Sequence, residues 1–166
     1  MKTINNRTQS IKALLGLLTV TLSSSLASAQ TTGTITLSGS VPAATAIVVT
    51  GVGTFNNLDL TTTQSNLQVA NVREINNTPN GYTVRMTSAN GGLLKNGSIG
   101  SLTYTARYNG VAANLNTSPV TVTNASASTS VVNVLKPLTI SYTGVSADSL
   151  MAGTYSDTLT FTITAN

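Results

Sequence analysis

The sequence predicts an all-β fold, and three observations lead to this prediction. Segments in which apolar and polar residues alternate recur from residue 33 to residue 166, and this period of two is typical of half-buried strands. Thr, Ser, Asn, Gly and Val dominate the composition; Thr and Val favour strands, and Asn and Gly favour the turns between them. No stretch of the sequence has a convincing helical period.

About seven short strands are expected, separated by turn residues. The segments with the strand pattern are 33–41, 45–53, 67–77, 78–86, 102–108, 109–115, 131–144 and 153–166. Val69, Val72 and Ile75 do not keep a strict period of two, which a β-bulge would explain. Asn80-Gly81 and Asn109-Gly110 are the kind of pair that accepts positive φ angles in hairpin turns.

The alternation also predicts which side chains face the core. The residues expected to point inward are Tyr82, Val84, Met86, Leu102, Tyr104, Leu159, Phe161 and Ile163. Arg85 and Arg107 are expected to point outward. Short strands of unequal length with turns between them predict an immunoglobulin-like β-sandwich. A β-barrel is the structural alternative, but the strands lack a repeating barrel-like spacing.

Residues 1–29 have the features of a secretory signal peptide. Three basic residues are followed by an apolar stretch at 13–20 and then by Ala27-Ser28-Ala29, the small-residue layout of a cleavage site. The apolar stretch is too short to cross a bilayer of roughly 30 Å as a helix, and no later segment is long and apolar enough for a membrane anchor. We therefore expect an exported chain without a membrane anchor.

Removal of this segment changes the charge argument. Three of the eight basic residues lie before residue 30, so five basic residues remain against four acidic ones, a net charge of +1. The five are scattered and are expected at outward strand positions: Arg73, Arg85, Lys95, Arg107 and Lys136. Nucleic-acid binding needs a clustered basic surface, so no nucleic-acid partner is expected.

The residues that most catalytic and metal sites need are absent or scattered. The chain has no His and no Cys, which excludes imidazole and thiolate ligands and nucleophile pairs that use them. The four carboxylates are far apart in the sequence, and Asp59, Asp148 and Asp157 are interpreted as turn or loop residues. We therefore expect no enzyme activity, no metal site and no cofactor.

The two ends of the chain resemble those of a known family. The segment 33–41, GTITLSGSV, resembles the N-terminal donor strand of chaperone-usher pilus (fimbrial) subunits, with its alternating apolar residues and one glycine. The segment 152–166, AGTYSDTLTFTITAN, is similar to the C-terminal strand of the same subunits and to that of spore coat U-like secreted proteins. The absence of cysteine is similar to alpha-type fimbrial subunits. The middle of the chain matches only in strand rhythm.

The resemblance implies a β-sandwich that lacks its last strand and is completed by a donor strand. It implies that residues 30–42 are the donor segment and residues 43–166 the pilin-like domain. The implied donor residues are Ile35, Leu37, Gly39 and Val41, and those of the acceptor or chaperone-binding strand are Tyr155, Leu159, Phe161 and Ile163. Neighbouring pilus subunits, a periplasmic chaperone and an outer-membrane usher are the implied partners.

The leading hypothesis is therefore a structural subunit of a bacterial pilus or surface fibre. Such a subunit would pass through the periplasm to a cell-surface fimbria or be secreted. The alternative is a secreted, self-contained β-sandwich that serves as a binding module or a coat protein. In that case the segment 35–41 would pair within its own domain as an ordinary first strand.

Overall fold

A computed structural model describes residues 31–166. The predicted signal peptide, residues 1–29, lies outside the described residues. The chain divides into two units, Met1–Gly39 and Ser40–Asn166. In the first unit, residues 31–39 form no helix or strand and their side chains are exposed.

The second unit is all-β, which confirms the predicted class. Its described residues form nine strands and no helix. The strands are β1 (Thr45–Gly51), β2 (Gln64–Asn76), β3 (Tyr82–Ser88), β4 (Leu93–Asn96), β5 (Gly100–Tyr108), β6 (Val111–Ala113), β7 (Val120–Ala125), β8 (Val132–Tyr142) and β9 (Leu159–Ala165).

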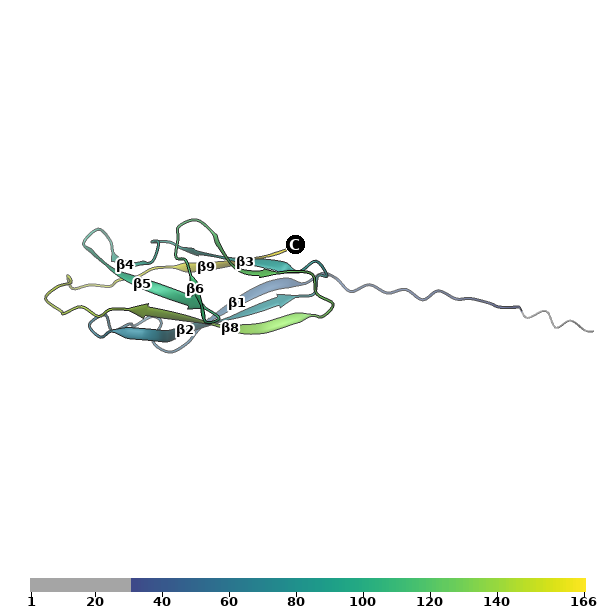
Figure 1. The fold of residues 1–166 in the computed structure, drawn as a ribbon, viewed down its shortest axis with the longest axis horizontal. Coiled ribbons are helices and arrows are strands. Elements are labelled where there is room, and N and C mark those ends of the chain that lie inside the picture. The colour runs from purple at the N-terminus through teal and green to yellow at the C-terminus, as the bar shows by residue number, and fades with distance from the viewer. Residues whose placement is uncertain (1–30) are drawn as a thin grey trace, which may run out of the picture. The chain divides into compact units, whose positions relative to one another are not determined.

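The strands build two antiparallel sheets, an arrangement consistent with a β-sandwich (Figure 1). The larger sheet has the order β1-β2-β8-β5-β4, and β6 also pairs with β5. The smaller sheet has the order β7-β3-β9. One apolar core draws side chains from both sheets, because each strand turns alternate residues toward the other sheet.

The residues that the alternation of β3, β5 and β9 predicts to face inward are buried or partly buried, and Arg85 and Arg107 face outward. Six of the eight residues expected to face inward are buried, and Leu159 and Ile163 are partly buried against the core. Val84 and Met86 of β3 are almost completely buried, at 0% and 1% exposure, while Arg85 between them is exposed. Arg107 is also exposed, and it donates a hydrogen bond to the carbonyl oxygen of Gly110.

The bulge expected in the segment 67–77 is present. The register between β2 and β8 shifts between Gln68 and Ala70, so that consecutive residues Val69 and Ala70 are both buried. Beyond the bulge, β2 buries Val72, Glu74 and Asn76. A carboxylate thus occupies an inward position, and the apolar Ile75 beside it is only partly buried.

The two predicted hairpin turns have different outcomes. Asn109 and Gly110 have φ angles of 50° and 79° and join the paired strands β5 and β6, as predicted. Gly81 also has a positive φ, 85°, but Asn80-Gly81 precedes β3 in a turn that connects β2 to a strand of the other sheet. The hairpin prediction at Asn80-Gly81 is therefore wrong, because the turn carries the chain between sheets.

Gly81→Ala should destabilise the domain much more than Gly110→Ala. Both substitutions place a side chain at positive φ, which costs roughly 1 to 2 kcal/mol. At Gly81 the added Cβ would also overlap the carbonyl oxygen of Ala125, whereas the space around Gly110 is open. Urea denaturation should therefore show a loss of unfolding free energy for Gly81→Ala at least about twice that for Gly110→Ala. Equal losses would contradict this packing argument.

Candidate binding groove between β1 and β9

Two edge strands lie beside each other without pairing. β1 is one edge strand of the larger sheet and β9 is one edge strand of the smaller sheet. They approach each other across the two sheets, yet within residues 31–166 β1 pairs only with β2 and β9 only with β3. The second edge of β9 therefore offers backbone N–H and C=O groups to an added strand.

The two strands run in opposite directions. β1 begins beside Asn76, the last residue of β2, and β3 begins beside Ala165, the last residue of β9. The start of β1 and the end of β9 therefore lie at the same end of the two sheets (Figure 1). We call this the Asn77 end, after the turn between β2 and β3. The loop end is the opposite one, where β1 ends and β9 begins.

A groove of about 340 Å³ lies between these strands. Val49 and Gly51 of β1 line one side, and Leu159 and Phe161 of β9 line the other. Further lining comes from β2, β4, β5 and β8, through Val69, Ala70, Leu94, Tyr104, Leu138 and Ile140. Val49 is 49% exposed although it faces the core side of β1. The groove is therefore an apolar surface that the described chain leaves uncovered.

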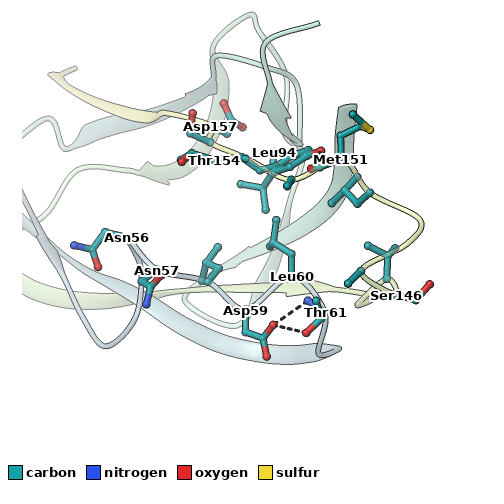
Figure 2. Close-up of a pocket in the computed structure, with 18 of the residues that line it drawn as sticks. Asn56, Asn57, Asp59, Leu60, Thr61, Leu94, Ser146, Met151, Thr154 and Asp157 are labelled. Atoms are coloured by element: carbon teal, nitrogen blue, oxygen red, sulfur yellow. Dashed lines mark hydrogen bonds between the residues drawn. The ribbon is translucent and has the colours of Figure 1, made fainter. Parts of the chain in front are cut away.

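A wider pocket of about 700 Å³ adjoins the groove at the loop end. Figure 2 shows the residues that line this pocket. Residues of the segments 55–61 and 145–157 line this pocket, and Phe55, Leu58, Leu94 and Asp157 line both hollows. Figure 2 shows Leu60 on one wall and Leu94 and Met151 on the opposite one. The two hollows therefore adjoin, and we call them together the channel, which extends from the middle of β9 to the loop end.

Asp157 holds the wall where the two hollows meet. Its Oδ2 accepts hydrogen bonds from the hydroxyls of Ser88 and Tyr104 at 2.5 and 2.7 Å, and its Oδ1 accepts from the backbone N–H of Asn90 and Thr158. Burial, followed by the hydrogen bond to Asp157, raises the pKa of Tyr104. Asp157 is therefore more than a loop residue, since it ties the start of β9 to β3 and β5.

Asp59 behaves as a turn residue, as predicted. Its Oδ1 accepts hydrogen bonds from the backbone N–H and the hydroxyl of Thr61, and its Oδ2 accepts from the hydroxyl of Thr62. In Figure 2 the Asp59 carboxylate points away from the pocket. These hydrogen bonds shape the segment 55–61 without placing a charge at the pocket's centre.

A buried polar cluster joins the two sheets away from the groove. Glu74 is fully buried, and its Oε1 accepts hydrogen bonds from Tyr108 and Thr123 at 2.6 and 2.8 Å. Its Oε2 accepts from Tyr82 and from the ammonium group of Lys136, both at 2.7 Å. Five strands of both sheets supply these residues. Lys136 thus points inward, and the expectation that it is an outward residue is wrong.

The partners of Glu74 keep its carboxylate charged. Burial by itself raises the pKa of this group, but hydrogen bonds from Lys136, Tyr108, Tyr82 and Thr123 outweigh it, so the pKa lies below its ordinary value. Burial and the hydrogen bonds to Glu74 also raise the pKa of both tyrosines. The cluster therefore stabilises the fold above the ordinary pKa of a glutamate, and this contribution is lost as the pH falls through the lowered value.

The predicted acceptor residues lie along the channel, with one exception. Leu159 and Phe161 line the groove, and Tyr155 lines the pocket at the loop end. Tyr155 precedes β9, and its hydroxyl donates a hydrogen bond to the carbonyl of Met151. Ile163 packs against the core nearer the Asn77 end and does not line the groove.

The predicted donor residues belong to no strand. Ile35, Leu37 and Val41 are 85%, 86% and 86% exposed, and Gly39 is also exposed. Residues 31–44 form no strand. The apolar side of this alternating segment therefore has no cover in the described part of the chain.

Asn77 fixes the residues that connect this segment to β1. Its side-chain Oδ1 accepts a hydrogen bond from the N–H of Ala44 at 2.6 Å, and its Nδ2 donates to the carbonyl of Pro42 at 2.9 Å. Its backbone N–H donates to the carbonyl of Ala44 at 3.1 Å. These three hydrogen bonds hold residues 42–44 beside the end of β2, just ahead of β1.

Sequence reasoning missed several residues of this region. The β1 side of the groove, with Val49, Gly51 and the adjoining Phe55, was not identified, because which strand faces β9 depends on long-range pairing. Glu74 was missed although Val72 and Asn76 place it on the inward face by the period of two. Asn77 carried no sequence signal, since its role depends on residues 42–44, far away in the chain.

No group of three or more His, Cys, Asp or Glu side chains within residues 31–166 could hold a metal ion. The same range contains no helix long and apolar enough to cross a membrane.

Comparison of the chain with protein-family models gave no matching family, and comparison with curated proteins gave no significant match.

Glu74→Gln should destabilise the domain at neutral pH and flatten its response to acid. The substitution leaves the Lys136 ammonium mostly buried without its counter-ion, at a cost of about 2 to 4 kcal/mol. Adding Lys136→Met should recover part of that loss, because the unpaired cation is then removed. Denaturation between neutral pH and pH about 3 should show a steeper loss of stability for the unmodified chain than for the double variant. Parallel pH profiles would show that Glu74 does not control acid stability.

Proposed function

We propose that this protein is a structural subunit of a surface fibre assembled by donor-strand complementation, as in a bacterial pilus. In this proposal the segment 35–41 of one copy adds to the free edge of β9 in the next copy and fills the groove. The observation that carries the proposal is the joint presence of an uncovered apolar groove and an unpaired segment with alternating apolar residues in one chain.

The order of the strands supports an immunoglobulin-like fold that lacks one strand. The complete constant-type fold has one sheet with strands in the order A-B-E-D and another with C-F-G. If β1, β2 and β3 are strands A, B and C, the order β1-β2-β8-β5 corresponds to A-B-E-D and β3-β9 to C-F. Strand G would lie at the free edge of β9, which is where the groove is.

Chain direction favours a neighbour's segment over the protein's own. Only residues 42–44 separate the segment from β1, so in its own groove it would have to reverse direction beside β1 and run parallel to β9. A segment from another copy can enter antiparallel to β9, and antiparallel pairing is slightly more stable per residue. In the alternative, a self-contained binding module or coat protein, the segment 35–41 would pair within its own domain as a first strand. Residues 31–44 form no strand, which argues against this alternative.

The energy available is large enough to drive assembly. Ile35, Leu37 and Val41 are almost fully exposed, and complete burial of each would contribute roughly 1.5 to 3 kcal/mol. Backbone hydrogen bonds to β9 would fix the register of the added strand. Because folded domains are stable by only about 5 to 15 kcal/mol, a subunit with an empty groove should be marginal. Such a subunit would need a chaperone that covers the groove before assembly.

A chain that carries its own antiparallel donor strand should be a stable monomer. The design deletes residues 30–41 and adds a copy of residues 34–41 after Asn166 through a linker of about four residues. The added copy starts at the Asn77 end and can run antiparallel to β9. We expect it to raise the free energy of unfolding by about 4 kcal/mol or more over the deletion chain alone, as measured by urea denaturation.

The matched control carries the same added strand with Ile35→Ser and Leu37→Ser in the copy. It should be no more stable than the deletion chain, because serine cannot fill the apolar groove. If the intact copy gives no stabilisation, or if the control is stabilised equally, the segment 35–41 is not a donor strand.

Gly39→Leu should block assembly, whereas Ser38→Leu should be tolerated. Gly39 lies on the same face of the segment as Ile35, Leu37 and Val41, so a leucine there would overpack the groove. Ser38 lies on the opposite face. Unboiled gels of the full-length chain should show a ladder of assembled species for the unmodified protein and Ser38→Leu, but not for Gly39→Leu. Equal ladders from both variants would contradict this orientation.

A further inference from the structure

We propose that the pocket at the loop end is a socket for the residues that connect the donor segment to β1 in a second copy of this chain. This end socket is lined by residues of the segments 55–61 and 145–157, and its occupant is the bridge formed by residues 42–44. The inference rests on the proposed function and adds a second contact surface, between the loop end of one subunit and the Asn77 end of the next.

The channel has the length needed to bring the bridge into the socket. Phe161 is the groove-lining residue of β9 closest to the Asn77 end. If Ile35 of an antiparallel donor lies beside Phe161, then Val41 lies six residues further along, beside Tyr155. Tyr155 lines the end socket. The chain after Val41 therefore leaves the groove through the socket.

The bridge is too short to avoid the socket. Four Cα steps separate Val41 from Thr45, and a fully extended chain spans at most about 14 Å over that distance. Asn77 of the donor holds residues 42 and 44 against the end of β2 with three hydrogen bonds. The donor domain must therefore begin directly outside the acceptor's loop end, with Asn77 against the socket.

The bridge of the donor and the end socket of the acceptor are both apolar surfaces. Residues 41–44 are Val-Pro-Ala-Ala, a short uncharged stretch. The socket exposes large apolar side chains in the single subunit, with Phe55 at 51% and Met151 at 64% exposure, and Leu58, Leu60 and Leu150 line it as well. A second copy would cover these side chains with the small apolar bridge, which contributes hydrophobic stabilisation beyond that of the donor strand.

Engineered disulfides test the contact directly, because the chain contains no cysteine. Counted on from Val41 beside Tyr155, Ala43 is expected near Gly153, next to the exposed Ala152 in the bend that lines the socket. Full-length chains with Ala43→Cys and chains with Ala152→Cys are mixed, allowed to assemble and oxidised. We expect a disulfide-linked dimer of the two chains on boiled, non-reduced gels, at roughly 100-fold the yield of a mixture with an unrelated site.

Two mixtures provide the controls. Ala112→Cys lies in β6, exposed and outside the socket, and should give only background cross-linking with Ala43→Cys. Ala127→Cys lies in the exposed loop between β7 and β8, just after β7 ends at the Asn77 end of the sheets. It would cross-link with Ala43→Cys in place of Ala152→Cys if the donor ran parallel to β9. Background levels for both, together with a strong Ala43–Ala152 product, support the socket.

Unboiled gels separate failure of the socket from failure of the proposed function. A ladder without the Ala43–Ala152 disulfide, or with equal cross-linking at Ala112, would overturn the socket and leave strand donation intact. No ladder for the unmodified chain would overturn the proposed function itself.

As a further readout, Asn77→Ala should keep the ladder but lower the yield of the Ala43–Ala152 disulfide several-fold, because the bridge then loses the two side-chain hydrogen bonds that position it. An unchanged yield of the Ala43–Ala152 disulfide would show that Asn77 does not help to position the bridge in the socket.

Discussion

The free edge of β9 is the constraint on which the rest of this structure depends. In a sandwich the inner faces of the two sheets form one core, and a gap between their edge strands leaves part of that core uncovered unless a strand or loop covers it. Here β1 and β9 approach each other but belong to different ladders, and Gly51 and the half-exposed Val49 leave the space between them unfilled. The channel follows from this one missing pairing, as does the exposed apolar surface within it.

The two ends of the interior are stabilised by different interactions. On one side of the core the Glu74 cluster links five strands of both sheets through an ion pair and three hydroxyl hydrogen bonds. Toward the loop end the apolar channel is open, and Asp157 and Asp59 are part of its lining and fix the shape of its walls through hydrogen bonds. The part of the domain around Glu74 is thus stabilised by polar groups that all have partners. The part around the channel would become more stable if its exposed apolar side chains were buried. A network of this kind also specifies the strand register, because a shift of β2 by one residue would place Glu74 in water and Ile75 against Lys136.

Much of the fold could be predicted from local patterns, and the rest depends on contacts between distant residues. Tyr82, Val84 and Met86 alternate with polar residues, so their burial follows from the period of a strand. The Asn109-Gly110 turn follows from residues that accept positive φ. Asn80-Gly81 has the same signature, yet local residues do not determine whether a turn returns the chain to the same sheet or carries it to the other one.

In the candidate site, too, some residues follow from local sequence patterns and others depend on contacts between distant residues. The alternating residues of β9 can be identified from the sequence because the pattern lies within one strand. The groove's second wall, the Asn77 hydrogen bonds and the inward Lys136 each depend on partners more than ten residues away in sequence. The bulge in β2 adds a further difficulty, since it buries two consecutive residues and reverses the inward face from that point onward.

Because the N-terminal segment and the channel are two different surfaces of the same chain, any fibre in which one fills the other would be polar. Every copy would face the same way, so one terminus of the fibre would carry an empty channel and the other an unused N-terminal segment. These termini are chemically different, and each could be stopped by a different agent. A free peptide with the sequence of the segment would cap the first, whereas a subunit without that segment could cap only the second. The length of a fibre could therefore be regulated separately at its two termini.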